Sequence, residues 1–287
     1  MTQAKKPVWF ITGCSTGFGR ELAKHLLENG YRVVVTARNT DKIQDLIEIS
    51  EDNALAIPLD VTNKQQVVDS VKRAEEQFGA IDVLVNNAGI GYFGAIEESD
   101  EREVRAMFEI NFWGLAEMTS AVLPKMRERR AGFIVNVSSI GGLVAFPTVG
   151  YYNATKFAVN GFSEALKKEV EPLGIKVLLI EPSGFRTDWA GRSANEAQQT
   201  ISDYAETAGV NKANIRSNSG QQPGDPVRAA KAIVQAVESD NPPFHLLLGR
   251  AALKGARQKL EDMRRDFEAW ADVSEGADFP LEAEAAK

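Results

Sequence analysis

The sequence predicts an α/β protein whose parallel β-sheet of about seven strands is covered by helices on both faces, a doubly wound sheet in three α/β/α layers. Three observations predict this fold. Short apolar runs alternate with longer helical patterns, which is typical of parallel strands joined by right-handed crossovers. Most runs are apolar at every position, as expected for strands buried on both faces. A glycine-rich segment joins the first run to the first helical pattern, where it permits a tight turn.

Each expected strand is a short apolar run that is followed by a helical or polar segment. The expected strands are Val8–Thr12, Arg32–Thr36, Ala54–Leu59, Val83–Asn86, Phe133–Val137, Lys176–Ile180 and His245–Leu248. The helical patterns between them are Gly17–Asn29, Asp41–Ser50, Lys64–Phe78, Asp100–Arg129, Tyr152–Pro172 and Pro226–Ser239. We therefore expect one domain over residues 1–250, followed by a C-terminal segment, 251–287.

Composition and charge exclude several classes of protein. Of the 287 residues, 44% are hydrophobic and 25% are charged, which is ordinary for a globular chain with a large core. The net charge of -7 argues against nucleic acid as a partner. One cysteine, Cys14, excludes an intrachain disulfide framework. The chain has no signal-peptide core and no run of about 18 apolar residues, so we expect a soluble, cytoplasmic protein without a membrane partner.

Two regions depart from the alternation of strands and helices. Residues 185–225 are polar and have no strong periodic pattern, which is typical of a substrate loop or lid. At the C-terminus an amphipathic helix is followed by an acidic tail, Asp272–Lys287, whose composition is typical of disorder. The apolar stripe of this helix either packs on the chain's own body or forms a subunit contact. It comprises Leu253, Ala256, Leu260, Met263, Phe267 and Trp270.

The segment Thr12–Gly19 (TGCSTGFG) predicts a phosphate-binding turn at the start of a fold of the Rossmann type. Gly13, Gly17 and Gly19 let the backbone turn and approach a pyrophosphate, and the following helix offers free N–H groups. A tight turn that binds nothing is the alternative. We expect the whole segment to contact a dinucleotide through Gly13, Ser15, Thr16, Gly17, Phe18 and Gly19.

The end of the second strand indicates which dinucleotide is bound. NAD-binding folds place an acidic residue there for the ribose hydroxyls, but this chain has Arg38 and no carboxylate before Asp41. A guanidinium can pair with the 2′-phosphate of NADP, so NADP(H) is expected in preference to NAD(H). A solvated surface arginine is the alternative. Asp60 and Val61 follow the third strand, where they are expected to flank the adenine.

Tyr152 and Lys156 share one face of a predicted helix because they are four residues apart. A free tyrosine is a poor base at neutral pH, since its pKa is about 10. A nearby ammonium and an oxidised nicotinamide would favour the phenolate and lower that pKa. The adjacent Tyr151 has Thr155 at the same spacing, so it is expected to serve as packing or as substrate wall.

These motifs, in this order, resemble those of the short-chain dehydrogenase/reductase family in its compact single-domain form. The motifs are the glycine segment, Asn86–Gly89 (NNAG), a lone Asn111, Ser138–Ser139, Tyr152–Lys156 (YNATK) and Pro182–Thr187 (PSGFRT). They span residues 8–187. Within the family the chain is similar to the branch of 17β-hydroxysteroid-dehydrogenase-like carbonyl reductases.

The resemblance implies a hydride transfer between NADP(H) and a ketone, aldehyde or alcohol. It implies four catalytic residues, Asn111, Ser139, Tyr152 and Lys156, with Ser139 on the substrate oxygen and Asn111 holding a water beside Lys156. Tyr152 and Lys156 also contact the cofactor. It further places at the cofactor the residues Asn86, Asn87, Ala88, Gly89, Pro182, Gly184, Phe185 and Thr187. Ser183 departs from the family's Pro-Gly pattern after the sixth strand.

The substrate side is expected to be apolar, with walls from Gly141–Phe146, Tyr92, Phe93, Phe185 and Trp189, although core packing explains these aromatics equally well. His25 and His245 lack metal-ligand spacing, so no metal is expected. The family pairs subunits through the helices Asp100–Arg129 and Tyr152–Pro172, which implies a homodimer or homotetramer. Two alternatives remain: a non-catalytic NADP sensor or scaffold, and an epimerase or dehydratase on the same nucleotide fold.

Overall fold

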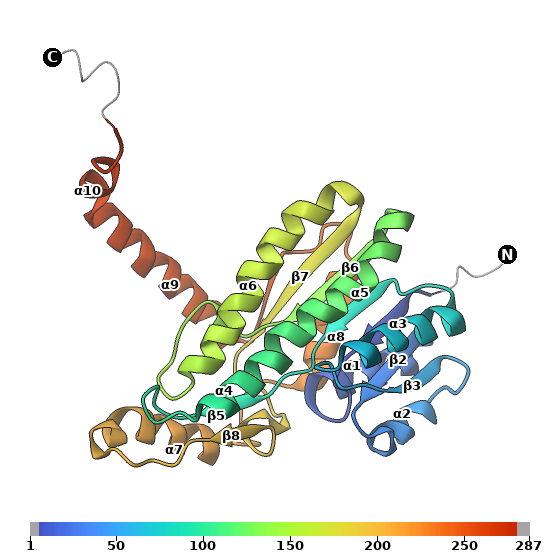
Figure 1. Cartoon of the computed structure of the whole chain (residues 1–287), viewed down its shortest axis with the longest axis horizontal. Coiled ribbons are helices and arrows are strands. Elements are labelled where there is room, and N and C mark those ends of the chain that lie inside the picture. The colour runs from blue at the N-terminus through green and yellow to red at the C-terminus, as the bar shows by residue number, and fades with distance from the viewer. Residues whose placement is uncertain (1–5, 280–287) are drawn as a thin grey trace.

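The computed structural model describes residues 6–279 and has a seven-stranded, fully parallel sheet at its centre (Figure 1). The strand order is β3-β2-β1-β4-β6-β7-β9. The predicted sheet is confirmed, and its strands are β1 (Val8–Ile11), β2 (Arg32–Ala37), β3 (Ala54–Pro58), β4 (Val83–Asn86), β6 (Gly132–Val137), β7 (Ile175–Pro182) and β9 (His245–Leu248).

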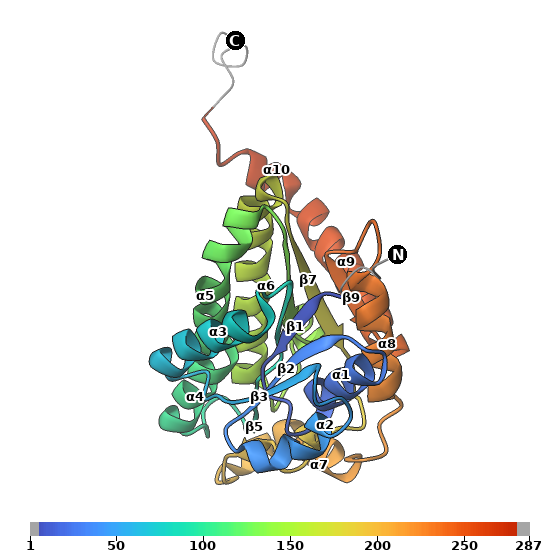
Figure 2. The ribbon, with the colours of Figure 1, turned by 90° about the vertical axis from the view of Figure 1, so that its right-hand side faces the viewer.

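Helices cover both faces of the sheet (Figure 2). One face is covered by α1 (Gly17–Glu28), the short α2 (Gln44–Ile47) and α8 (Pro226–Val237). The other is covered by α3 (Lys64–Phe78), α5 (Gly114–Arg129) and α6 (Gly150–Val170). Alternate residues of the same strands face the two layers: Trp9 and Ile11 point toward α1, whereas Val8 and Phe10 point toward α3 and α5. The continuous apolar strands in the sequence follow from this double covering.

The strand order reverses between β1 and β4, because the chain extends the sheet outward from β1 to β3 and then returns to the other side of β1. The carboxyl ends of β1 and β4 diverge at this switch point and leave a crevice between the loops that follow them. The fold thus places the glycine segment opposite Asn86–Gly89.

Two predicted helices differ from the structure. The pattern Asp41–Ser50 forms only a 3-10 turn, η1 (Thr40–Ile43), and α2. The pattern Asp100–Arg129 is interrupted: α4 (Glu101–Phe108) and α5 are joined by a π-helical turn, η2 (Glu109–Trp113). A π-turn inserts one extra residue into the helical repeat, which apolar periodicity does not register.

The polar region 185–225 is more ordered than its composition predicts. It contains a 3-10 turn η5 (Asp188–Ala190), a strand β8 (Ala194–Glu196), the turns η6 (Ser202–Tyr204) and η7 (Ala205–Gly209), and a helix α7 (Val210–Ser217). β8 pairs in parallel with β5 (Gly91–Phe93), so this region is tied to the loop after β4. It lies beyond the carboxyl ends of the sheet, as a substrate loop would (Figure 1).

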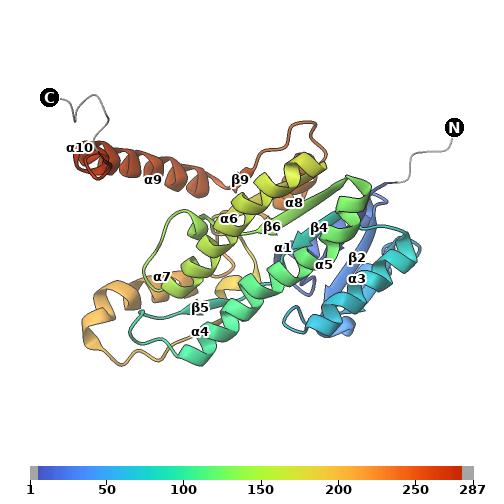
Figure 3. The same cartoon turned by 45° about the horizontal axis from the view of Figure 1, so that its top comes forward.

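The C-terminal helix α9 (Arg250–Ala269) projects from the body and is followed by α10 (Ala271–Glu275) (Figure 3). Only its first turns pack on the chain, through Ala252 and Ala256. Of the two alternatives, packing of the whole stripe on the chain's own body is wrong, because Leu260, Phe267 and Trp270 are 63–67% exposed, and the subunit contact stays a prediction. The predicted acidic tail begins in α10, and residues 280–287 lie outside the described residues. Between residues 6 and 279, no helix is both long and apolar enough to cross a membrane.

Candidate active site

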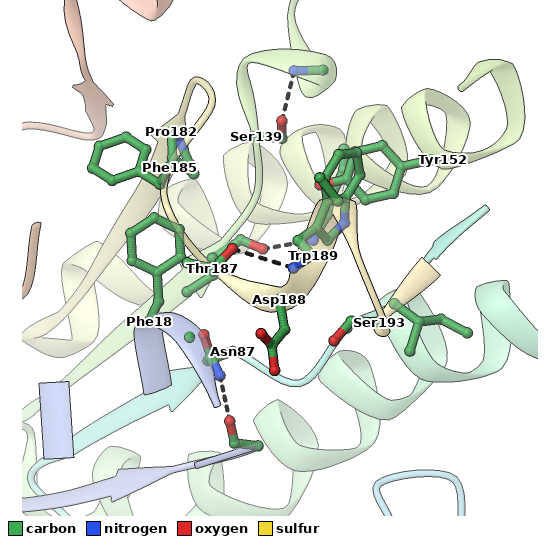
Figure 4. A pocket seen from close by; sticks show the side chains of 18 of the residues that line it. Phe18, Asn87, Ser139, Tyr152, Pro182, Phe185, Thr187, Asp188, Trp189 and Ser193 are labelled. Atoms are coloured by element: carbon green, nitrogen blue, oxygen red, sulfur yellow. Dashed lines mark hydrogen bonds between the residues drawn. The ribbon is translucent and has the colours of Figure 1, made fainter. Parts of the chain in front are cut away.

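A cleft of about 1550 Å³ opens at the carboxyl ends of the strands and extends under region 185–225 (Figure 4). Almost all predicted site residues line it. These are Gly13, Ser15, Thr16, Gly17, Phe18, Arg38, Asp60, Val61, Asn87, Ala88, Gly89, Ser139, Tyr152, Lys156, Pro182, Gly184, Phe185 and Thr187.

The glycines of the first turn are required by close backbone contacts. Gly13 and Gly17 have φ values of 72° and 63°, which L side chains rarely adopt. A Cβ on Gly13 would lie 3.0 Å from the Cα of Ala88. Gly19 does not line the cleft; its Cα faces the carbonyl of Gly13, and a Cβ there would lie 2.6 Å from that oxygen. The loop can therefore turn and pack against the Asn87–Ala88 segment only with glycine at positions 13 and 19.

Thr12 and Asn87 tie the two loops of the crevice together. The Thr12 hydroxyl oxygen accepts hydrogen bonds from the backbone N–H groups of Asn87 and Ala88, at 2.9 and 3.0 Å. The Asn87 amide donates to the carbonyls of Thr12 and Gly13, both at 2.9 Å. Asn87 thus holds the shape of the glycine loop. Thr12 was not among the predicted site residues, and its place at the head of the motif was the only signal.

Asn86 does not reach the cleft, so its predicted contact with the cofactor is wrong. Its side chain is buried under α5 and donates to Thr119 Oγ1 (3.0 Å) and to Asn136 Oδ1 (2.9 Å). Successive residues of a strand point to opposite faces, and Asn86 is the last residue of β4. Of the two asparagines, only Asn87 borders the crevice.

The far end of the cleft is basic. Arg38 follows β2 and is exposed there, and Arg20 of α1 and Lys42 of η1 line the same end. Arg20 also forms an ion pair with Asp45. Thr16 is the N-cap of α1, and within the described chain its side chain accepts no hydrogen bond from the first helical turn. The free N–H groups at the start of α1 and the three cations, Arg38, Arg20 and Lys42, suit a ligand with several phosphate groups. One of these phosphates would lie near Arg38. Arg20 and Lys42 were missed, since the chain carries many such surface cations.

Tyr152 and Lys156 lie together on α6, both buried, at the middle of the cleft. Lys156 Nζ donates to the Val137 carbonyl (2.8 Å) and lies 5.7 Å from the centroid of the Tyr152 ring. Burial lowers the pKa of Lys156 to about 8. Burial also raises the pKa of Tyr152 to about 12, an effect that the Ser139 hydroxyl partly offsets. The expected lowering of the tyrosine pKa is therefore not produced by the protein's own groups, because desolvation outweighs them.

Ser139 follows β6 and lines the cleft close to Tyr152, whose pKa its hydroxyl lowers (Figure 4). Its Oγ accepts a hydrogen bond from the backbone N–H of Gly141 at 2.9 Å. This bond uses a lone pair and leaves the hydroxyl proton available to a ligand oxygen. Gly141 lies close to Ser139, since a Cβ on Gly141 would be 3.3 Å from Ser139 Oγ.

Asn111 occupies the π-turn between α4 and α5 and is buried behind the cleft, which it does not line. Its amide donates to the Ile90 carbonyl (2.9 Å) and to Thr155 Oγ1 (3.2 Å), and its oxygen accepts from the Ile90 N–H (2.8 Å). Asn111 thus fixes the loop after Gly89. Its hydrogen-bonding capacity is directed at protein groups, and its role beside Lys156 stays a prediction.

The outer part of the cleft is lined by apolar side chains from several loops. They include Val144, Phe146, Val149, Trp189 and Ile215. The Trp189 ring lies 4.9 Å from the Tyr152 ring, and the Phe18 and Phe185 rings are 5.0 Å apart (Figure 4). Tyr92 and Phe93 do not line this cleft; they pack with Met107 and Val104 instead, so their predicted place at the nicotinamide is wrong. Tyr151 packs in the same cluster, as predicted.

Comparison with known proteins agrees with this architecture. Residues 7–198 match the family model described as short chain dehydrogenase. An oxidoreductase named BOA17 from Botryotinia fuckeliana is 37% identical over 93% of this chain and 97% of its own length. A 3-ketodihydrosphingosine reductase from Bacteroides thetaiotaomicron is 39% identical over 83% of this chain and 86% of its own length.

Solved structures give the same result. A short-chain dehydrogenase from Streptomyces avermitilis superposes with a TM-score of 0.90 at 40% identity, covering 96% of this chain and 100% of its own. A short-chain dehydrogenase/reductase from Burkholderia phymatum in complex with NAD has a TM-score of 0.80 at 26% identity, covering 93% and 97%. ElxO with NADP bound has a TM-score of 0.71 at 29% identity, covering 87% and 99%.

Proposed function

The chain belongs to the short-chain dehydrogenase/reductase family of oxidoreductases, and from this premise we propose that it interconverts a ketone or aldehyde and the corresponding alcohol with NADP(H). One observation carries the proposal. Ser139, whose Oγ accepts a hydrogen bond from the Gly141 N–H, lines the middle of one cleft together with the buried pair Tyr152 and Lys156, and the far end of that cleft is basic. A protein that only senses a dinucleotide has no need of such a group of proton donors, so the sensor reading is weaker.

The dinucleotide fits the residues of this cleft. The glycine loop and the N-terminus of α1 would hold the pyrophosphate, and Asp60 and Val61 would flank the adenine. Arg38 would hold the 2′-phosphate, with Arg20 and Lys42 adding positive charge. Lys156 would hydrogen-bond the nicotinamide ribose. When bound, the cofactor supplies the two electrons of the reduction to the carbonyl carbon.

The catalytic role of each side chain follows from the proton or the charge that it carries. The Ser139 hydroxyl donates to the substrate oxygen and stabilises the negative charge that develops there. Tyr152, held protonated by its raised pKa, donates its phenolic proton to the same oxygen. Lys156 stabilises the resulting phenolate, since its ammonium lies 5.7 Å from the centroid of the ring. Asn111 positions the Ile90 loop beside this group.

We propose a hydrophobic substrate. Phe146, Val149, Trp189 and Ile215 form an apolar outer cleft, which favours a carbonyl carried on an apolar body. The name of the Bacteroides relative, a 3-ketodihydrosphingosine reductase, is consistent with a long apolar ketone. The apolar cleft equally accommodates a steroid-like ketone, as the predicted 17β-hydroxysteroid-dehydrogenase-like branch implies.

A panel assay tests the proposal. The purified protein is incubated with NADPH or NADH and a series of apolar ketones, aldehydes and secondary alcohols, and the absorbance of the reduced cofactor is followed. We expect turnover with apolar ketones and NADPH, and slower turnover with NADH. Binding of NADPH without turnover of any member would favour the sensor, and a strong preference for NADH would remove the role given to Arg38.

A further inference from the structure

A second group of buried polar residues lies behind the serine loop, on the side away from the cofactor cleft. At its centre is Glu181 of β7, whose side chain is 0% exposed. Glu181 Oε1 accepts from the Asn160 amide of α6 at 2.8 Å, and Oε2 lies 2.9 Å from His245 Nδ1 on β9. None of the three residues lines the cleft, so none of them can contact the proposed substrate or cofactor.

Asn160 connects this carboxylate to the loop that carries Ser139. Its oxygen accepts from the Ser138 hydroxyl at 2.6 Å, and its amide also donates to the Gly142 carbonyl at 3.1 Å. Ser138 and Gly142 bracket Ser139, so one side chain holds both ends of the turn that presents the catalytic hydroxyl. The packing is tight, because a Cβ on Gly142 would lie 2.7 Å from Ser138 Oγ and 2.9 Å from Asn160 Oδ1.

A buried carboxylate needs compensation, since removing an ion from water costs several kcal/mol. Asn160 supplies a hydrogen bond and His245 supplies the charge; the His245 side chain is 45% exposed and can exchange protons with solvent. The hydrogen bond to Glu181 raises the pKa of His245, against the effect of partial burial. Glu164 of α6 also faces His245 and is itself paired with Lys168, and the Phe244 ring packs on the imidazole.

We propose that Glu181 is a positioning residue for Ser139, which acts through Asn160 and is held in place by His245. The inference rests on the proposed function, because it assigns Glu181 to the serine of that reaction. Asn160 could otherwise rotate about its side-chain bonds, since both of its other partners, the Ser138 hydroxyl and the Gly142 carbonyl, belong to the serine turn itself. The carboxylate anchors Asn160 to the central strand β7 and so fixes the direction of the Ser139 hydroxyl.

The test compares Glu181→Leu with Glu181→Gln. Leucine removes both hydrogen bonds, whereas glutamine keeps an oxygen that accepts from Asn160. For Glu181→Leu we expect kcat to fall about tenfold or more, as for a small misplacement of a catalytic group. Glu181→Gln should keep kcat within about threefold, and NADPH affinity should be unchanged in both. Asn136→Ala is the control for loss of a buried amide network, because Asn136 bonds Asn86 and Ser163 and not the serine loop.

Two further measurements separate positioning from general loss of structure. In a Ser139→Ala background, Glu181→Leu should cost less than about twofold in residual turnover, since both changes act through one hydroxyl. An equal cost in the two backgrounds would overturn the inference. Hydrogen exchange of the amides of residues 138–142 gives a readout without turnover: it should accelerate in Glu181→Leu and not in Glu181→Gln.

The two proposals can fail separately. If the wild type reduces carbonyls but the serine-loop amides and kcat are the same in Glu181→Leu, the positioning role is wrong and the proposed function stands. If the wild type turns over no carbonyl, the proposed function fails, and the exchange measurement still decides whether Glu181 anchors the loop. Should Glu181→Leu not fold, His245→Gln replaces it. Loss of the His245 contact to Glu181 should then accelerate exchange of the amides of residues 138–142 and lower kcat; exchange and kcat equal to those of the wild type would contradict the inference.

Discussion

The ammonium nitrogen of Lys156 lies 5.7 Å from the centroid of the Tyr152 ring, and both side chains are buried. Burial acts on the two groups in opposite directions, because it penalises the charged form of each. It lowers the pKa of Lys156 to about 8 and raises that of Tyr152 to about 12. Near neutral pH the protein alone therefore holds a protonated tyrosine beside a lysine that is close to its titration point, an arrangement suited to donating a proton.

This pair predicts the pH dependence of carbonyl reduction. Below about pH 8 Lys156 is an ammonium, and above it the ammonium that stabilises the phenolate is lost. We expect kcat/KM for NADPH to be level below about pH 8 and to fall above it, since this parameter reports the free enzyme's groups. Tyr152 adds no second fall below pH 10 because its pKa is raised. A profile that stays level to pH 9.5 would contradict the role of Lys156.

Arg38 predicts the choice of cofactor. Arg38→Leu removes a charge-assisted hydrogen bond to the 2′-phosphate, so KM for NADPH should rise about tenfold to a hundredfold. KM for NADH, which lacks this phosphate, should change less than about twofold. Arg73→Leu is the matched control, since Arg73 is exposed on α3 and does not line the cleft. An equal rise for both cofactors would mean that Arg38 does not recognise the 2′-phosphate.

The cleft residues that the sequence predicts are those with a fixed spacing. Helical spacing selects Tyr152 over Tyr151, because only Tyr152 has a lysine four residues later, and in the structure Tyr151 packs away from the cleft. The glycines are predictable because their backbone conformations exclude other residues.

Contacts that residues make across the fold could not be predicted from the sequence, even where the residue itself was singled out. Asn111 lies in a π-turn that leaves no mark on the apolar pattern, and Asn86 and Asn87 differ only in which face of the strand end they occupy. Glu181 and His245 are 64 residues apart in the chain and meet only because β7 and β9 are adjacent. The exposed distal part of α9 has an apolar stripe like that of a packed helix, so periodicity alone does not show whether the stripe is covered.

The close contact between Gly224 and the Phe185 ring predicts that a side chain at position 224 disturbs the cofactor cleft. A Cβ at this position would lie 2.5 Å from Cδ2 of Phe185, whose ring packs on Phe18. Gly224→Ala should therefore displace Phe185 and weaken NADPH binding by about tenfold, as overpacking costs about 1–3 kcal/mol. Gly161→Ala is the control, since a Cβ there would meet nothing within 4 Å apart from its chain neighbours and the backbone of its own helix. Unchanged NADPH affinity by fluorescence titration in Gly224→Ala would show that Phe185 does not shape the site.

If the chain forms the homodimer or homotetramer that the family resemblance implies, it has a surface whose disruption yields monomers. Trp113 in the turn between α4 and α5 is 52% exposed, and Phe157 on the neighbouring α6 is 43% exposed. Both belong to the helices that the family resemblance assigns to subunit pairing. Trp113→Glu should shift the protein from dimer or tetramer to monomer in sedimentation velocity. Val68→Glu, at an apolar position on α3 that is 56% exposed, should leave the assembly intact. A wild type that sediments as a monomer would refute the proposal.

The central claim is that Tyr152 donates the proton in a carbonyl reduction, and the kcat of Tyr152→Phe tests it most directly. The ring that packs on Trp189 is kept in this variant, so only the hydroxyl is lost. We predict that kcat falls about 10²- to 10⁴-fold while the Kd for NADPH stays within about twofold. Tyr151→Phe, assayed in parallel, should be close to wild type. Near-normal turnover by Tyr152→Phe would contradict the account.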